Sequence, residues 1–220
     1  MTDGIPAKKF ARELPSTSDY VKSAESKVRI MENDAMDEKK RCKWCNMKNL
    51  TYIAYHDEEW CRPNFEDAYL YEMLILESFQ AGLSWECVLN KREAFRKAYD
   101  DFDWKKVCAY DNRKIQDLLE NKEIIRNRLK INASISNSRI FERIVQEYGS
   151  FHNYLREFTK DTIFSETENT TNELSDAISA DLQKRGMKFV GSTIIYSYLQ
   201  AIGVIYSHEK GCYLYDDGNY

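Results

Sequence analysis

Apolar side chains recur three and four residues apart along most of the chain, which is the spacing of amphipathic helices. Residues 66–80 carry such a stripe and are followed by Gly82, so we predict a helix that ends there. Ser84 is placed to cap a second helix that reaches about Tyr99. Further helices are predicted over about 103–110, 112–119, 124–148, 150–158, 175–185 and 192–205. Residues 160–173 are predicted to be a loop, no strand pattern is evident, and an all-α fold follows.

The character of the chain changes near residue 41. Residues 1–40 are polar, poor in aromatic side chains and alternate basic with acidic positions, so they can bury little apolar surface. From Cys42 onward aromatic residues become frequent. We therefore expect 1–40 to be a flexible extension and 41–215 to be the functional domain.

Charge and hydropathy narrow the class of protein. The 220 residues include 32 Lys and Arg against 36 Asp and Glu, a net charge of −4, which argues against a broad basic face that coats nucleic acid. A small local phosphate contact remains compatible with that balance. No apolar run approaches the roughly 18–20 residues that a membrane span requires, and no apolar stretch follows the basic residues near the N-terminus. We expect a cytoplasmic protein, or a nuclear one in a eukaryote, without a membrane partner.

Cysteine and histidine side chains gather near the two ends of the predicted domain. Because no export signal is evident, the six cysteines favour metal ligands or small core residues over disulfides. His208 and Cys212 are four residues apart, and Cys42, Cys45 and His56 lie in an irregular segment at the other end. A structural zinc site takes four such ligands, so these five residues compete for four places. The alternative is a histidine at a helix end together with scattered buried cysteines.

One carboxylate falls where an apolar side chain is expected. Glu77 shares the stripe of Leu74 on the predicted helix, and burying an unpaired charge there is costly. It either caps a backbone group, meets an arginine, or forms an acid in an aromatic pocket with Trp85, Tyr52 and Tyr55. An aromatic pocket with one acid suits a flat, cationic ring through stacking, cation–π attraction and hydrogen bonding.

A glycine-bracketed turn separates the last two predicted helices. Gly186 and Gly191 flank it, Lys188 lies within it, and Ser192 starts the next helix. Backbone N–H groups at such a helix start form a natural phosphate site. The alternative is an ordinary helix–helix connection.

Taken together, these residues resemble the DNA-3-methyladenine glycosylase I family of the helix-hairpin-helix DNA glycosylases. The resemblance covers about 41–213 and rests on the segments 41–44, 52–60, 76–85, 91–95, 124–128, 188–193 and 208–212. The chain departs from the family's pattern at Cys61, where members usually have glycine, at Asn127, where histidine is common, and at Arg156, where tryptophan is usual.

The resemblance implies a two-lobed helical fold and assigns three groups of residues. One structural zinc ion per chain would join the N- and C-terminal segments through Cys42, His56, His208 and Cys212, leaving Cys45 outside the ligand set. The base pocket would comprise Glu77, as the catalytic residue, with Tyr52, Tyr55, Trp85, Trp44 and Trp60. The DNA-binding hairpin would comprise Gly186, Lys188, Gly191 and Ser192.

The implied activity is DNA repair by hydrolysis of the N-glycosidic bond of 3-methyladenine after the base leaves the stack. The methylated base is cationic and departs as a neutral molecule, so little acid–base help is needed; 192–207 contains no carboxylate, which fits that expectation. The partners would be double-stranded DNA containing 3-methyladenine and, as product, the free base, bound by a monomer. Two other classes stay open: a non-catalytic binder of damaged DNA, and a zinc-stapled helical interaction protein.

Overall fold

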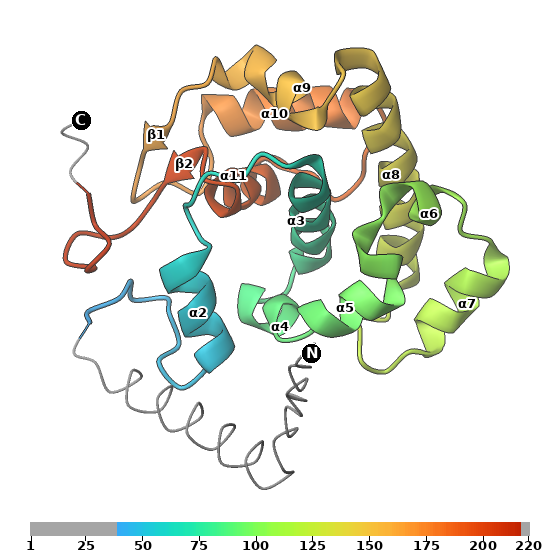
Figure 1. The fold of residues 1–220 in the computed structure, drawn as a ribbon, viewed down its shortest axis with the longest axis horizontal. Coiled ribbons are helices and arrows are strands. Elements are labelled where there is room, and N and C mark those ends of the chain that lie inside the picture. The colour runs from blue at the N-terminus through green and yellow to red at the C-terminus, as the bar shows by residue number, and fades with distance from the viewer. Residues whose placement is uncertain (1–38, 217–220) are drawn as a thin grey trace, which may run out of the picture. The chain divides into compact units, whose positions relative to one another are not determined.

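The computed structural model describes residues 39–216 (Figure 1). The described residues from Lys40 onward belong to one compact unit, and the following description is confined to that unit. The flexible extension predicted over 1–40 lies outside the described residues except for its last two positions. The elements are α2 (Leu50–Glu58), α3 (Asp67–Gln80), α4 (Trp85–Leu89), α5 (Arg92–Ala98), the 3₁₀ turn η1 (Asp100–Phe102), α6 (Trp104–Cys108), α7 (Asn112–Glu120), α8 (Arg128–Tyr148), α9 (Phe151–Thr159), β1 (Phe164–Ser165), α10 (Glu173–Lys184), α11 (Ser192–Ala201) and β2 (Ile205–Tyr206). None of the helices within 39–216 combines the length and the apolar character that a membrane crossing demands.

Helix starts follow the local capping chemistry. The Ser84 side chain accepts the backbone N–H of Cys87, as the sequence predicts. Gly149 ends α8 with φ +84°, a left-handed conformation that glycine adopts without strain. The helix expected to open at 175 instead begins earlier, because Asn172 is its cap and exchanges hydrogen bonds with Ser175 in a capping box.

Several predicted boundaries were wrong for identifiable reasons. The single helix expected from Ser84 to about Tyr99 is two, α4 and α5, separated at Asn90 and Lys91. The last helix ends at Ala201 rather than 205, because Gly203 has φ +77° and lies against the backbone of the Arg62–Pro63 segment, where a Cβ would come within 2.3 Å.

The predicted loop over 160–173 contains a short strand. In it, β1 pairs in parallel with β2, with Phe164 opposite Ile205 and Ser165 opposite Tyr206. Two residues per strand are too few to display an alternating pattern in the sequence. The helical fold class is otherwise confirmed.

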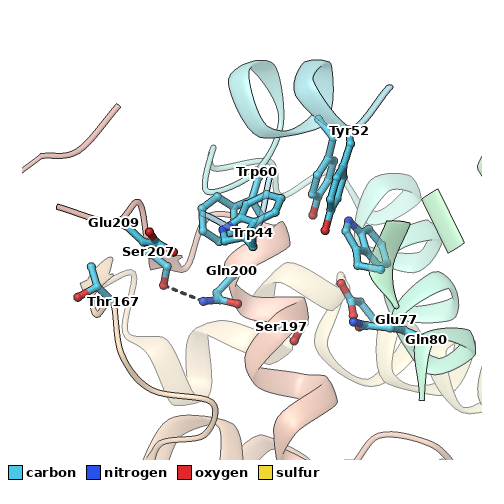
Figure 2. A pocket seen from close by; sticks show the side chains of 12 residues that line it. Trp44, Tyr52, Trp60, Glu77, Gln80, Thr167, Ser197, Gln200, Ser207 and Glu209 are labelled. Carbon is cyan, nitrogen blue, oxygen red and sulfur yellow. Dashed lines mark hydrogen bonds between the residues drawn. The ribbon is translucent and has the colours of Figure 1, made fainter. Parts of the chain in front are cut away.

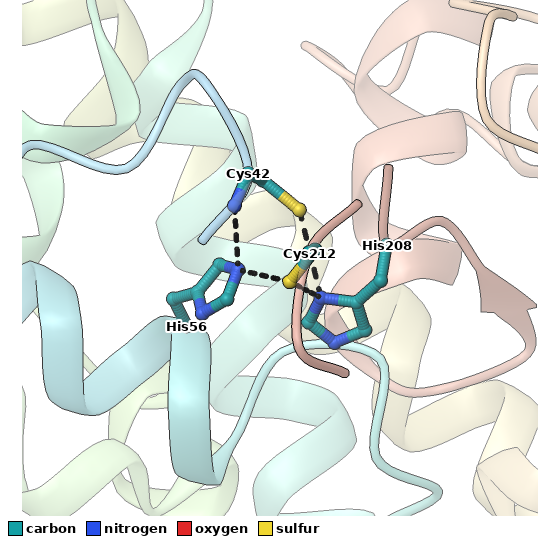
Figure 3. A group of neighbouring side chains, drawn as sticks. All are labelled: Cys42, His56, His208 and Cys212. Carbon is teal, nitrogen blue, oxygen red and sulfur yellow. Dashed lines mark hydrogen bonds between the residues drawn. The ribbon is translucent and has the colours of Figure 1, made fainter. Parts of the chain in front are cut away.

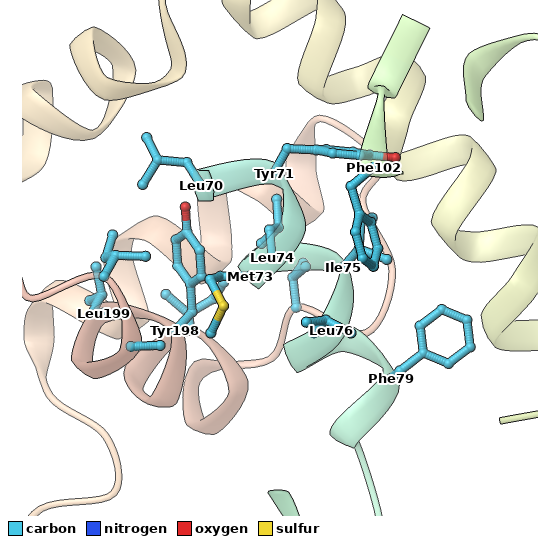
Figure 4. Packing of buried hydrophobic residues seen from close by; sticks show 14 of the residues in the cluster. Leu70, Tyr71, Met73, Leu74, Ile75, Leu76, Phe79, Phe102, Tyr198 and Leu199 are labelled. Carbon is cyan, nitrogen blue, oxygen red and sulfur yellow. The ribbon is translucent and has the colours of Figure 1, made fainter. Parts of the chain in front are cut away.

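Helix α3 forms the centre of the hydrophobic core. Every side chain from Leu70 to Phe79 is buried, and α3 packs against α11, α8 and α9. Figure 4 shows its apolar side chains facing Tyr198 and Leu199 of α11 and Phe102 of η1. Fully burying one large apolar side chain contributes about 1.5–3 kcal/mol, so α3 is held rigidly on several sides. Functional groups on α3 are therefore fixed in place.

The two irregular ends of the described region lie together. The backbone N–H of Tyr213 donates to the carbonyl of Lys40 at 2.7 Å, and the N–H of Glu209 donates to Cys42 Sγ at 3.3 Å. The predicted junction between N- and C-terminal segments is thus present in the fold.

Candidate active site

One cavity collects the side chains predicted to form an aromatic pocket with an acid. It lies between α2, the end of α3, α4, α11 and the C-terminal segment (Figure 2). All six predicted pocket residues line it. The complete lining is Trp44, Tyr52, Tyr55, Trp60, Glu77, Gln80, Trp85, Thr167, Ser197, Gln200, Ser207 and Glu209.

The carboxylate of Glu77 is buried without compensation. Glu77 is 2% exposed, and its Oε2 has no hydrogen-bond partner among residues 39–216. Burial raises its pKa well above the usual range of a glutamate, and no neighbouring charge offsets this effect. This oxygen therefore neither caps a backbone group nor pairs with an arginine, the two alternatives considered from the sequence. The group is available to a ligand in the cavity.

The aromatic side chains line the cavity in two groups of contacting rings. Tyr55 and Trp85 have ring centroids 5.4 Å apart, and Trp44 lies 5.2 Å from Tyr52 and 4.6 Å from Trp60. Burial raises the pKa of Tyr52 to about 12 and that of Tyr55 well above its usual range. Both phenols are therefore neutral hydrogen-bond donors at neutral pH.

Six lining residues were not found from the sequence: Gln80, Thr167, Ser197, Gln200, Ser207 and Glu209. Gln80 carried a usable signal, since it lies three residues after Glu77 and shares its helical face. Ser197 and Gln200 show the same spacing on α11. Thr167 comes from a loop in which no periodicity marks the inward side chain.

A second group of side chains fits a metal ion beside the cavity. The ligand atoms of Cys42, His56, His208 and Cys212 all lie within 4.8 Å of one another, and the four residues are buried (Figure 3). Cys212 Sγ is 3.5 Å from His56 Nε2 and 3.7 Å from His208 Nδ1, and Cys42 Sγ is 3.6 Å from His208 Nδ1. Cys45 is not in the group, and its Sγ approaches the carbonyl of Tyr52 instead.

Neighbouring groups orient one of these histidines. His56 Nδ1 lies 2.7 Å from Asp57 Oδ1, and Arg41 holds the same carboxylate with contacts of 2.6–3.0 Å. A carboxylate on Nδ1 leaves Nε2 as the coordinating atom. Burial lowers the pKa of His56 and lowers that of His208 to about 4, so both rings are neutral and able to bind a metal at neutral pH.

The metal-ligating group and the cavity share a wall. Trp60 stacks on His56 with centroids 6.1 Å apart and meets His208 edge-on at 4.8 Å. Trp44 lies 5.3 Å from His56. The aromatic side chains that line one end of the cavity therefore rest on the histidines.

The turn between α10 and α11 has the features of a rigid hairpin. Gly186 has φ +100°, and Asn137 of α8 both donates to the carbonyl of Lys188 and accepts its N–H. Gly191 is the N-cap residue before α11 and provides no side-chain cap, and the space beside it is open. The Ser192 hydroxyl is engaged internally by α10, so any contact that Ser192 makes outside the protein uses its backbone N–H.

Comparison with known proteins decides the family. The family described as methyladenine glycosylase matches residues 44–215, well over half of the chain. The chain belongs to the methyladenine glycosylase family. It is 43% identical over 182 residues to DNA-3-methyladenine glycosylase 1 of Escherichia coli (strain K12), covering 80% of this chain and 96% of the relative.

Solved structures of methyladenine glycosylases have the same fold. A crystal structure of 3-methyladenine DNA glycosylase I superposes with a TM-score of 0.77 at 39% identity, covering 80% of this chain and all of the other. A variant of such an enzyme in complex with 3-methyladenine superposes with a TM-score of 0.75 at 30% identity, covering 79% and 96%.

The departures from the methyladenine glycosylase pattern are accommodated locally. Cys61 adopts φ +62°, a conformation natural to the glycine usual there, and its Sγ accepts the N–H of Ser207. Asn127 caps α8 with its side chain, and Arg156 pairs with Asp161 at the surface. None of these three changes removes a cavity or metal-group residue.

Proposed function

We propose that this chain is a DNA repair glycosylase that hydrolyses the N-glycosidic bond of 3-methyladenine in alkylated double-stranded DNA. The observation that carries the proposal is Glu77, a buried, partnerless carboxylate in an aromatic cavity. A structural protein gains nothing from such a group, whereas a site for a cationic base uses both its charge and its acceptor oxygens. Family membership and the relatives named above support the same activity.

The chemistry needs little proton transfer. Methylation at N3 makes the base cationic in DNA, so bond cleavage releases a neutral base. Glu77 is proposed as the catalytic residue: once the cation enters, the carboxyl group releases its proton to solvent water, and the resulting carboxylate hydrogen-bonds the base and stabilises its positive charge. Residues 192–207 contain no carboxylate, and the mechanism does not require one there.

The base is proposed to lie along the aromatic wall rather than between two rings. Inserting a flat ring between two others requires them to be roughly 7 Å apart, twice an ordinary contact distance. Tyr55 and Trp85 are 5.4 Å apart at 51° to each other. Trp85 therefore offers a stacking face, Tyr55 and Tyr52 close the pocket by contact and hydrogen bonding, and Trp44 and Trp60 complete its far side.

The metal is proposed to be one structural zinc ion held by Cys42, His56, His208 and Cys212. Zinc bonds of roughly 2.3 Å to sulfur and 2.0 Å to nitrogen put the S and N corners of a tetrahedron about 3.5 Å apart. Three of the four sulfur–nitrogen separations, at 3.5, 3.6 and 3.7 Å, agree with that geometry. Four protein ligands leave no open position, so the ion would link the N- and C-terminal segments without taking part in the reaction.

The turn between α10 and α11 is proposed to be the DNA-binding part of a helix-hairpin-helix motif. The uncapped first N–H groups of α11, which include that of Ser192, would bind backbone phosphate, and exposed Lys188 would add positive charge. Gly186 and Gly191 would allow close approach of the DNA backbone. A local phosphate contact of this kind is compatible with a net charge of −4.

Residues 41–215 are proposed to be the complete glycosylase domain, acting as a monomer. The family match over residues 44–215 supports this extent of the domain.

A base-release assay on methylated DNA tests the proposal. Chromatography of the supernatant should show free 3-methyladenine accumulating with time and protein concentration. Binding to methylated DNA without release would favour a non-catalytic damage binder. Neither binding nor release by folded protein would favour a helical interaction protein with an aromatic core.

A further inference from the structure

Unsatisfied polar atoms concentrate in one place. Within 39–216, four buried side-chain atoms lack a hydrogen-bond partner: Glu77 Oε2, Gln80 Oε1, Trp85 Nε1 and Tyr198 Oη. The first three belong to residues that line the cavity, and the fourth lies in the core against α3. Buried polar groups are almost always paired, so three orphans around one cavity indicate partners that a ligand supplies.

Gln80 and Glu77 present their oxygens from the same face of α3. They are three residues apart, one turn along the helix, and Figure 2 shows their side chains next to each other at the same end of the cavity. Each contributes an acceptor oxygen without a partner. The cavity thus offers two neighbouring acceptors, which complements a group that carries two N–H donors.

The backbone on both sides of Gln80 is held in place by a buried lysine. The buried ammonium of Lys130 donates to the carbonyls of Phe79 at 2.8 Å and Ala81 at 2.6 Å, on either side of Gln80. This contact pins the last turn of α3, where carbonyl groups otherwise lack partners. The position of Gln80 is therefore prepared before a ligand arrives, as recognition requires.

We propose that Gln80 is a specificity-determining residue that reads the exocyclic amine of the base. This inference rests on the proposed function. Glu77 accepts one N–H of the primary amine and the Gln80 amide oxygen accepts the other. With the Gln80 amide oriented as it is here, a base with an oxo group at the same ring position, as in guanine or hypoxanthine, would place a third acceptor against these two. Unpaired buried acceptors discriminate strongly, so Gln80 favours adenine-type over 6-oxo bases.

Calorimetric titration of the full-length chain with two free bases tests this role. Gln80→Met keeps the length of the side chain and removes the amide. Affinity for 3-methyladenine should fall by roughly three- to tenfold, the effect of one neutral hydrogen bond. Affinity for 3-methylhypoxanthine should stay level or rise, so the preference for the amino base falls. The melting temperature should stay level or rise, because an unsatisfied buried atom is removed.

Gln146→Met, at an exposed position of α8, is the matched control and should change neither affinity. If Gln80→Met loses its helical circular dichroism, Gln80→Ala gives the same comparison without adding volume. An unchanged ratio of the two affinities in the folded variant would overturn the role of Gln80 while leaving the proposed function intact. Failure of the wild type to bind 3-methyladenine would instead overturn the proposed function itself.

Discussion

Glu77 is a single residue whose burial lowers the stability of the folded chain. Its position on an apolar stripe was readable from the sequence, and the structure confirms its burial. The sequence did not reveal that neither a cap nor an arginine satisfies it, because that depends on which segments pack against α3. Gln80 was within reach of the same argument, but glutamine at the end of a helix is ordinary and gave no reason to single it out.

The buried carboxylate predicts a pH-dependent gain in stability for Glu77→Gln. Burial raises the pKa of Glu77, so the folded chain retains a proton that the unfolded chain releases above its ordinary pKa. The resulting stabilisation is complete below that ordinary pKa and is lost as pH rises through the raised pKa. Thermal melts should therefore show the variant level with the wild type near pH 4.5 and more stable at pH 8. A variant that is less stable at pH 8 would indicate a structural glutamate.

At the scale of elements, most helices were predictable, but α2, which carries His56, was missed in a segment expected to be irregular, and several helix ends were wrong. Ser84 is a local capping signal, and it was read correctly as the start of a helix. The division between α4 and α5, and the strands β1 and β2, depend on tertiary contacts that no local pattern shows. In the same way, five candidate metal ligands were visible, and only the packing of the terminal segments brings four of them within range.

The four-residue metal group predicts which cysteine matters. Purified protein should contain about one zinc ion per chain. Cys212→Ser should lower the zinc content and reduce the melting temperature by several degrees, because the ion would link the N- and C-terminal segments in the folded chain only. Elemental analysis and thermal melts measure both effects. Cys45→Ser is the matched control and should retain its zinc. Loss of zinc in the control, with full occupancy in Cys212→Ser, would show that the ligand set is wrong.

The hairpin predicts that DNA binding and base binding can be separated. Gly191 faces open space, so Gly191→Leu should fold normally while obstructing the approach of a phosphate to the start of α11. Affinity for methylated DNA should drop at least tenfold, the range in which loss of a charged hydrogen bond falls, and affinity for free 3-methyladenine should remain. Ala180→Leu, exposed on α10, serves as control. Equal loss of both affinities in folded Gly191→Leu would contradict the separation of the DNA-binding hairpin from the base pocket.

The whole molecule couples its two sites through one aromatic wall. The group of Cys42, His56, His208 and Cys212 brings residues of the N- and C-terminal segments together, and Trp44 and Trp60 rest on its histidines while lining the cavity. Rigid α3 supplies the opposite side. A metal ion bound by these four residues would in this way determine the shape of the pocket without taking part in the reaction.

This arrangement predicts that zinc removal weakens base binding. Dialysis against a chelator should lower the affinity for 3-methyladenine several-fold, because the wall formed by Trp44 and Trp60 loses its support. Fluorescence titration before dialysis, after it and after return of zinc measures the effect, and zinc should restore the affinity. Unchanged affinity in protein shown to be metal-free would mean that the two sites are independent.

The most direct test is the rate at which 3-methyladenine is released from alkylated DNA with protein in excess over substrate. This rate depends on the cavity, on the carboxylate of Glu77 and on the reaction itself. Glu77→Gln should release the base roughly ten- to a hundredfold more slowly than the wild type, the loss expected for one charged hydrogen bond. Glu157→Gln, exposed on α9, should match the wild type. Release by folded Glu77→Gln at the wild-type rate would contradict the placement of the reaction in this cavity.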